Sequence, residues 1–291
     1  KLKKGLKVNI VGVTAQSVST HVLTSGRKFD YCIIDEASQL TVPSCLAAVE
    51  SAKTFVLVGD PYQLPPLVLK EKSKSEGMAQ SLFYRLAQKH PSAMNVLEMQ
   101  YRMNSDIVLV ANTLVYNFTL RCGNQEVANS ELSFPLWASL KSPKLSLSKM
   151  DKDRNWLKKV CRPSSKVVLL DTDNATAKEE GKKAKQKESS INRTEVEAVK
   201  HIVAAFIDTA HLKSSQIGVI TPFRRQARVL NEVLSSKNIE VNTIDRCQGR
   251  DWDCVIISCV EDNNSGYIGE ILKDWKRMNV AFTRPKKKLI V

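Results

Sequence analysis

Short apolar runs recur along the chain and predict its strands. Most of them are rich in β-branched residues and do not alternate with polar residues, a pattern typical of strands buried on both faces of a parallel sheet. The runs are Val8–Val13, Tyr31–Ile34, Thr54–Val58, Lys166–Leu170, Gln216–Ile220 and Cys254–Val260. We therefore predict a strand at each run.

Helical patterns lie between several of these runs. In Glu195–Ile207 and Arg224–Leu234 the apolar residues recur at spacings of three and four, which is typical of amphipathic helices. Strands and helices that follow one another in this way indicate the α/β class. Ligands of such folds gather at the C-terminal ends of the strands, where Asp35, Gly59 and Thr221 are expected.

Two stretches do not fit this alternation. Residues 117–163 have weak periodicity and many Ser and Lys residues, so we interpret them as an irregular insertion near the start of a second domain. Residues 178–190 are charged and almost free of apolar residues, which predicts a mobile loop. A solvated loop is the simpler interpretation of such a charge run, and phosphate binding is the alternative.

Length, charge and cysteine usage narrow the class of protein. A chain of 291 residues favours two domains, and 44 Lys and Arg against 30 Asp and Glu give a net charge of +14. That charge favours an anionic partner, nucleic acid ahead of an acidic membrane surface, although a soluble basic protein is the simpler alternative. The seven cysteines are scattered without a C-x-x-C pair, as in reduced intracellular proteins. The sequence predicts no membrane span and no signal peptide.

The first candidate for chemistry is a pair of carboxylates at the end of the second run. Asp35 follows an apolar strand directly, so its carboxylate would be held at the sheet edge, where it can bind magnesium. Glu36 would then be the base that polarises the attacking water in phosphoryl transfer from ATP. The alternative for an Asp-Glu pair is an ordinary helix-capping turn.

The second candidate follows the next run. Gly59 and Asp60 end that strand in a turn, which would place Gln63 close to the carboxylates of the neighbouring strand. The amide of Gln63 can contact both a phosphate oxygen and water, so it can report whether the terminal phosphate is present. A turn stiffened by Pro61, Pro65 and Pro66 is the alternative, and it does not require Gln63.

Five segments, in order along the chain, resemble the motifs of superfamily 1 helicases of the 5′ to 3′ group (superfamily 1B). They resemble motifs II to VI respectively: residues 35–39, 59–66, 100–103, 241–245 with 248–251, and 277–284. Residues 121–129 and 272–280 further resemble the eukaryotic DNA replication helicase/nuclease family. The RNA-surveillance helicases share the general motifs, so the preference for DNA over RNA depends on these two segments.

This resemblance implies a P-loop NTPase of RecA-like fold with two parallel-sheet domains. Residues 1–92 would be the C-terminal part of the first domain, which would be incomplete, and residues 93–291 would be the second domain with the irregular insertion. ATP and magnesium are the implied cofactors. Tyr101 would stack on the adenine, and Arg102 and Arg284 would reach the terminal phosphate as arginine fingers. Gly249 would allow close approach of the backbone to the nucleotide, and Asp251 would accept a hydrogen bond from the ribose.

The resemblance also implies a path for single-stranded DNA, or alternatively RNA, across the tops of both domains. Most contacts would be to phosphate and sugar, with little sequence preference. The expected contacts are Thr14, Gln16, Ser17, Thr221, Arg224 and Thr243. For Thr14 and Ser17, capping of a helix N-terminus is an equal alternative.

One part of such an ATPase is missing from the sequence. A phosphate loop has the pattern Gly-x-x-x-x-Gly-Lys-Ser/Thr, and no segment of the chain matches it. The chain does not begin with Met, and it ends in apolar residues that look like an interrupted strand, so we expect a fragment of a longer protein. The family's nuclease domain with its iron-sulfur cysteines would then lie upstream.

A smaller departure from the family is Pro285, where Ala is usual after the motif VI arginine. We expect Arg284 to keep its position despite this proline.

The sequence thus predicts a fragment of an ATP-dependent DNA helicase of replication and repair. It would couple ATP hydrolysis to movement along single-stranded DNA in the nucleus, or also in mitochondria, together with replication and repair proteins and without a membrane. The isolated fragment should hydrolyse ATP negligibly. The alternatives are an RNA helicase of the RNA-surveillance type and a nucleic-acid-binding remnant that no longer hydrolyses ATP.

Overall fold

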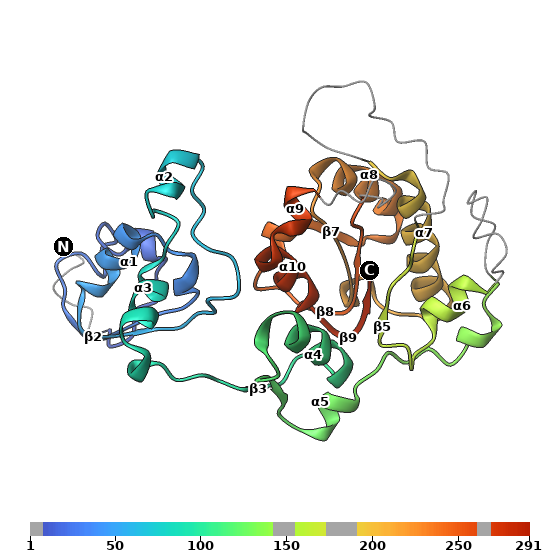
Figure 1. The fold of residues 1–291 in the computed structure, drawn as a ribbon, viewed down its shortest axis with the longest axis horizontal. Coiled ribbons are helices and arrows are strands. Elements are labelled where there is room, and N and C mark those ends of the chain that lie inside the picture. The colour runs from blue at the N-terminus through green and yellow to red at the C-terminus, as the bar shows by residue number, and fades with distance from the viewer. Residues whose placement is uncertain (1–7, 142–154, 173–190, 261–268) are drawn as a thin grey trace. The chain divides into compact units, whose positions relative to one another are not determined.

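The computed structural model describes residues 8–141, 155–172, 191–260 and 269–291. The chain divides into two compact units, residues 1–96 and 97–291, which we call the N-terminal and the C-terminal unit. The sequence predicts this boundary four residues earlier, between residues 92 and 93. Figure 1 shows the elements of each unit.

The N-terminal unit is built around two parallel strands, β1 (Phe29–Ile34) and β2 (Ala52–Leu57), with Phe29 opposite Ala52 and Ile34 opposite Leu57. The helix α1 (Val42–Val49) connects them, and α2 (Glu71–Ser75) and α3 (Leu82–Lys89) follow. Short 3-10 turns lie at Ala15–Ser17, Ala37–Gln39 and Pro91–Ala93. The core of this unit is small and contains Val18, Ile34, Ala37, Cys45 and Ala48.

The strand predicted at Val8–Val13 does not form, because no described strand of the N-terminal unit offers it hydrogen bonds and Ile10 is 89% exposed. The prediction that β1 and β2 are buried on both faces is also wrong. Among the described strands each of these two pairs only with the other, and Tyr31, Ile33, Phe55 and Val56 are exposed.

The C-terminal unit contains a five-stranded parallel sheet in the order β5-β9-β8-β6-β7. Its strands are β5 (Val167–Val168), β6 (Ile217–Thr221), β7 (Glu240–Thr243), β8 (Trp252–Ile257) and β9 (Pro285–Ile290). The central strands β6 and β8 are buried almost throughout, as predicted. A short parallel pair, β3 (Met99–Gln100) and β4 (Arg121–Cys122), lies at the start of this unit.

Helices flank this sheet, and Figure 1 shows α10 on one side of it and α7 on the other. They are α4 (Ser105–Ala111), α5 (Gln125–Asn129), α6 (Trp156–Cys161), α7 (Arg193–Ala204), α8 (Arg224–Leu234), α9 (Glu270–Lys273) and α10 (Trp275–Phe282). Single π-helical turns follow α4 at Asn112–Tyr116 and α7 at Ala205–Thr209. Both predicted helices are confirmed, and α8 has the predicted bounds. No helix in the described part of the chain is apolar and long enough to span a membrane.

The irregular insertion predicted at residues 117–163 needs a correction where the structure describes it. Its elements are short, but the side chains of Leu132, Phe134, Trp156 and Val160 are buried in the same core as α7, α8 and the central strands. This stretch is therefore part of the C-terminal unit's core. Residues 142–154 and the charged run 178–190 lie outside the described residues.

Candidate functional site

The two predicted carboxylates lie in a tight turn directly after β1. Glu36 has a left-handed backbone conformation (φ 51°), and its N–H donates to Asp35 Oδ1 over 2.9 Å. Gln39 Nε2 donates to Glu36 Oε2 over 2.8 Å. Asp35 is exposed and Glu36 is half-buried, so the turn presents carboxylate oxygens to solvent at the C-terminal edge of the two strands.

The turn after β2 lies against the turn after β1. Val58 N–H donates to the Ile34 carbonyl, and Ala37 N–H donates to the Val58 carbonyl, each over 2.8 Å. A Cβ at Gly59 would come within 3.0 Å of the backbone nitrogen of Ser38, which is tighter than an ordinary contact. A glycine at position 59 is therefore what lets the two turns approach each other.

Gln63 is in the second of these turns, and its amide is held locally. Gln63 Nε2 donates to Asp60 Oδ2 over 3.0 Å, and Asp60 Oδ1 accepts the N–H of Tyr62 over 2.9 Å. The structure thus brings the two turns together, through the bonds of Val58 and Ala37. Direct action of Gln63 on the carboxylates stays a prediction.

In the C-terminal unit, Gln100 shapes the turn that carries Tyr101 and Arg102. Its side-chain oxygen accepts the N–H groups of Arg102 over 2.9 Å and Met103 over 2.8 Å, and its Nε2 donates to the Met103 carbonyl over 2.8 Å. Asn104, which is fully buried, caps α4 by accepting the N–H of Ile107, and its amide donates to the Lys287 carbonyl over 2.8 Å. These bonds fix the turn to the start of β9.

Tyr101 is 66% exposed, as a residue that stacks on a base would need to be. Its ring lies against Gly123, where an added Cβ would overlap the ring. Gly123 N–H also donates to the Gln100 carbonyl over 2.8 Å. The absence of a side chain at position 123 therefore sets the position of this ring.

Arg102 and Asp251, both predicted site residues, form an ion pair. Arg102 Nε lies 3.5 Å from Asp251 Oδ2, and Lys286 Nζ lies 2.6 Å from Asp251 Oδ1. Arg102 Nη1 also donates to the Thr283 carbonyl over 3.4 Å. The sequence did not point to Lys286, because it is one of three consecutive lysines and only the fold shows that Lys286 meets Asp251 while Lys287 meets Asp253 and Lys288 meets backbone carbonyls.

Arg284 lies next to this cluster in sequence, but its side chain is only 2% exposed. Its guanidinium donates to the Val280 carbonyl over 2.8 Å, the Arg250 carbonyl over 3.3 Å and the Thr283 hydroxyl over 3.0 Å. Pro285 is the first residue of β9. In this conformation the guanidinium is bound within its own unit, so contact with a phosphate would require it to leave these acceptors.

Gly249 has a left-handed backbone (φ 76°) and open space around the position of a Cβ. Its conformation favours glycine, and the exposed backbone is compatible with close approach of a ligand.

The residues predicted to contact nucleic acid differ in exposure. In the N-terminal unit, Thr14 and Gln16 are exposed and Ser17 is half-buried. Thr14 is the residue before the 3-10 turn Ala15–Ser17, but its hydroxyl pairs with the hydroxyl of Ser17 over 2.7 Å instead of capping a backbone N–H. In the C-terminal unit, Arg224 is exposed.

The other two threonines of the predicted path lie at the ends of β6 and β7. Thr243 is half-buried, whereas Thr221 is completely buried and its hydroxyl accepts the N–H of Phe223 over 3.4 Å. In this conformation Thr221 supports the turn before α8 and does not reach the surface.

A polar network that the sequence analysis missed lies at the C-terminal end of β8. Glu195 Oε2 accepts the hydroxyl of Ser258 over 2.5 Å, and both carboxylate oxygens accept the N–H of Val260, over 2.9 and 3.1 Å. Burial raises the pKa of Glu195, against the opposing effect of these hydrogen bonds. Asn192 caps α7 by accepting the N–H of Glu195 over 3.1 Å. The Asn-x-x-Glu spacing at the start of α7 was the sequence signal that could have revealed this network.

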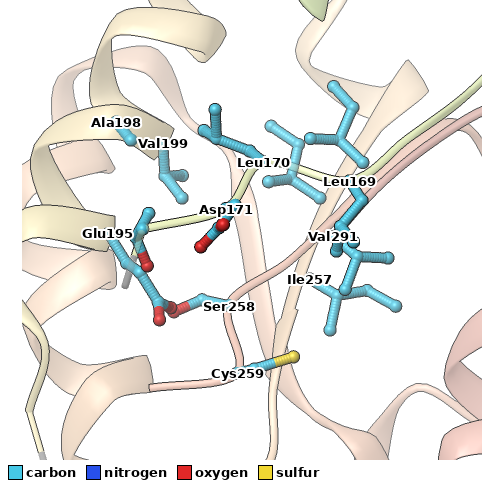
Figure 2. A pocket seen from close by; sticks show the side chains of 13 residues that line it. Leu169, Leu170, Asp171, Glu195, Ala198, Val199, Ile257, Ser258, Cys259 and Val291 are labelled. Atoms are coloured by element: carbon cyan, nitrogen blue, oxygen red, sulfur yellow. The ribbon is translucent and has the colours of Figure 1, made fainter. Parts of the chain in front are cut away.

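Glu195 and Ser258 also line a pocket of about 320 Å³ between α7 and the ends of β5, β8 and β9. Figure 2 shows these two side chains pointing toward one another, with Asp171 and Cys259 nearby and an apolar wall that includes Leu169 and Val291. No group of three or more His, Cys, Asp or Glu residues suited to a metal ion occurs among the described residues.

The sequence of the chain matches models of known protein families. Two family models match the chain, and both describe an AAA domain. One covers residues 6–71 and the other covers residues 78–291, which is more than half of the chain. The chain belongs to the AAA domain family. Together with the parallel sheets and flanking helices, this membership confirms the predicted α/β fold of RecA-like type.

Curated relatives confirm the resemblance to the replication helicase/nuclease family. The chain is 41% identical over 287 residues to the DNA replication ATP-dependent helicase/nuclease DNA2 of Mus musculus, covering 97% of this chain and 26% of the relative. It is 40% identical over 272 residues to the corresponding protein of Schizosaccharomyces pombe, covering 93% of this chain and 19% of the relative. The Arabidopsis thaliana helicase/nuclease JHS1 is 39% identical over 293 residues, covering all of this chain and 21% of the relative.

The chain thus spans between 19% and 26% of the length of these relatives. A solved structure titled "The structure of PRRSV helicase" also aligns with 89% of this chain and 34% of its own. Its TM-score of 0.38 and identity of 13% are too low to bear on fold or function.

Proposed function

We propose that this chain is part of an ATP-dependent 5′ to 3′ DNA helicase of replication and repair, which couples ATP hydrolysis to movement along single-stranded DNA. The observation that carries the proposal is the pair of turns after β1 and β2, which join Asp35 and Glu36 to the Gly59–Gln63 loop in a chain about 40% identical to replication helicase/nucleases. The cluster of Arg102 and Asp251 in the C-terminal unit supports it.

The residues after β1 fit a magnesium ion that accompanies a nucleotide. Magnesium prefers oxygen ligands, and it is usually held by one or two carboxylates together with waters and phosphates. Asp35 would hold the ion, which would neutralise charge on the terminal phosphates. Glu36 would orient the attacking water and accept its proton, because its carboxylate is fixed by the amide of Gln39.

The arginines would supply positive charge to the transition state. Arg102 could reach a phosphate more easily than Arg284, because its ion pair with Asp251 is long and its side chain is 38% exposed. Arg284 would contribute only after leaving its backbone acceptors. Tyr101 would stack on the adenine, Gly249 would allow the backbone to approach the nucleotide, and Asp251 would accept a hydrogen bond from the ribose.

Nucleic acid would contact exposed polar and basic groups at the C-terminal strand ends. The proposed contacts are Thr14, Gln16 and Ser17 in the N-terminal unit and Arg224 and Thr243 in the C-terminal unit, with Thr221 supporting the turn beneath. We propose a nuclear location, with mitochondria as a second one, and replication and repair proteins as partners. Nuclease activity and an iron-sulfur cluster would belong to other parts of the protein.

The test has two parts. First, the chain should bind a fluorescein-labelled oligo(dT) of about 20 nucleotides in an anisotropy titration, with an affinity that falls as salt rises because phosphates release counterions. An oligo(U) of the same length should bind more weakly, and equal or tighter binding of the RNA would favour an RNA helicase instead.

Second, ATP hydrolysis by the full-length protein should be stimulated more by single-stranded DNA than by RNA. Glu36→Gln should lower turnover by about 100-fold or more while DNA binding persists, as expected for loss of a general base. Glu71→Gln, on an exposed helix of the same unit, is the matched control. An unaffected Glu36→Gln variant would leave only a nucleic-acid-binding role.

A further inference from the structure

Three buried polar side chains and Glu195 connect β8 to the first turn of α8. Gln226, which is fully buried on α8, donates through Nε2 to the Ser258 hydroxyl over 2.9 Å, and that hydroxyl donates to Glu195 Oε2 over 2.5 Å. Gln226 also exchanges hydrogen bonds of 3.1 Å with the backbone N–H and carbonyl of Asn192. Two of these hydrogen bonds form a chain of donors from Gln226 on α8, through Ser258 at the end of β8, to the carboxylate of Glu195 on α7.

Glu195 also holds a strained residue. Val260 has a positive φ of 70°, which is an outlier for a β-branched side chain, and it is almost fully buried. Such a conformation persists only where the surroundings determine it. The N–H of Val260 donates to both oxygens of Glu195, and the Val260 carbonyl accepts from Asn192 Nδ2 over 3.3 Å. Glu195 thus fixes the path of the chain where it leaves β8.

The same network lies directly beneath a basic surface. Arg224, Arg225 and Arg228 are exposed on α8, while Gln226 between them points into the network. The network also contacts the neighbouring strand β6. Ser258 N–H donates to the carbonyl of Ile220 over 2.9 Å, and Ile220 precedes Thr221 on that strand. Ser258 and Gln226 therefore connect the end of β8 to the first turn of α8, which carries Arg224.

We infer that Glu195 is a positioning residue for nucleic-acid binding, which acts through Ser258 and Gln226 to hold the first turn of α8 and Arg224 in place for phosphate. This inference rests on the proposed function, since Arg224 is one of its DNA contacts. Glu195 itself does not touch nucleic acid.

The sign of the effect makes the inference testable. Loss of a carboxylate makes the chain more basic, so electrostatics alone predicts tighter binding of an anionic strand. Glu195→Gln keeps one acceptor oxygen but replaces the other with an NH₂ group, which in either orientation faces the N–H of Val260, so it should loosen the network. We expect this variant to bind oligo(dT) about 5- to 10-fold more weakly than wild type at the same salt.

The matched control is Glu197→Gln, which removes the same charge from the same helix. Glu197 is exposed and pairs only with Lys200 and His201 among the ion pairs of the described residues. This control should bind oligo(dT) as tightly as wild type or slightly more tightly. Equal affinities of Glu195→Gln and Glu197→Gln would overturn the inference.

A double-mutant cycle tests the route through Ser258. If Glu195 acts through that hydroxyl, Glu195→Gln should cause little further loss of affinity in a Ser258→Ala background. A full additional loss in that background would contradict the proposed route. Because loss of Glu195 could unfold the strained turn, the comparison is repeated in a Val260→Gly background, where glycine adopts the positive φ without strain.

Failure of the two proposals can be distinguished. Absence of oligo(dT) binding by the wild-type chain would overturn the proposed function and this inference with it. Binding by wild type that Glu195→Gln leaves unchanged, with unchanged circular dichroism, would overturn the inference alone.

Discussion

Two strands with the same apolar pattern, one in each unit, differ in how deeply they are buried. β1 reads Phe-Asp-Tyr-Cys-Ile-Ile and β8 reads Trp-Asp-Cys-Val-Ile-Ile. Ile33 near the end of β1 is 72% exposed, whereas Ile256 at the same position of β8 is 2% exposed. The apolar pattern therefore specifies a strand but not how deeply it is buried.

The neighbours of each strand account for the difference. β8 lies between β9 and β6, and its residues Cys254 and Ile256 pack in a core with side chains of α6, α7 and α8. β1 has β2 as its single strand partner, and its core cluster is built around Ile34 and α1. Gln226 and Arg284, which are buried and form several hydrogen bonds each, also lie in the C-terminal unit.

The largest expected difference between the two strands comes from equal truncations. Ile256→Ala should lower the free energy of unfolding of the C-terminal unit by roughly 3 to 4 kcal/mol, because it leaves a cavity in a closed core. Ile33→Ala should change the stability of the N-terminal unit by less than about 0.5 kcal/mol, because the side chain is mostly in water already.

Tryptophan fluorescence separates the two units in a urea titration. All four tryptophans, Trp137, Trp156, Trp252 and Trp275, lie in the C-terminal unit. The N-terminal unit is followed by hydrogen exchange of peptides from β1. Similar losses for both truncations would mean that β1 is as well packed as β8.

Two glycines, one in each unit, extend the comparison of burial to single contacts. A Cβ at Gly218 on β6 would overlap the ring of Trp252 on β8, so Gly218→Ala should destabilise the C-terminal unit by roughly 2 kcal/mol. Gly12 in the N-terminal unit has no atom within 4 Å of its Cβ position, and Gly12→Ala should have little effect. Unfolding curves that do not distinguish Gly218→Ala from wild type would show that the Trp252 ring can move aside.

The same contrast between local pattern and burial explains which parts of the fold can be predicted from the sequence. The apolar runs at β1, β2, β6 and β8 and the periodicity of α8 are local signals, and the structure confirms those elements. The run at Val8–Val13 has the same local signal but no described neighbour to pair with, so it forms no strand. The burial of Leu132, Phe134, Trp156 and Val160 could not be predicted, because the weak periodicity around them conceals contacts that depend on tertiary packing.

The features of the candidate site likewise divide into those that local sequence predicts and those that depend on the fold. The turn with Asp35 and Glu36 and its approach to Gly59 follow from strand ends and motif spacing. The ion pair of Lys286 with Asp251, the burial of Arg284 and the network around Glu195 depend on which strands are neighbours. No local pattern records those neighbours.

A smaller effect is expected from a buried lysine that has no counterpart in the described part of the N-terminal unit. Lys288 is 1% exposed, and its Nζ donates to the Arg162 carbonyl over 3.0 Å and to the Ser165 carbonyl. Lys288→Met keeps most of the volume but leaves both carbonyls without this donor, so it should cost roughly 1 to 2 kcal/mol.

Lys53→Met is the matched control, because Lys53 pairs with Asp30 on the surface of the N-terminal unit, where its side chain is 76% exposed. Its expected change is within about 0.5 kcal/mol. The measurement for Lys288→Met is again urea unfolding by tryptophan fluorescence. An unchanged midpoint would mean that water or a backbone shift replaces the ammonium group.

The smallest expected effect is the pH dependence that Glu195 gives to the stability of the C-terminal unit. Burial raises the pKa of Glu195 above its ordinary value of 4.5. A carboxyl group whose folded pKa is raised binds its proton more tightly in the folded state, so its contribution to stability is present below pH 4.5 and is lost as the pH rises through the folded pKa. The melting temperature of the wild type should therefore fall over that range relative to Glu195→Gln, which has no proton to lose. We expect the difference in melting temperature between the wild type and Glu195→Gln to change by a small amount with pH, as measured by tryptophan fluorescence at constant ionic strength. A difference that is independent of pH would show that Ser258 and Val260 stabilise the carboxylate enough to cancel the cost of burying its charge.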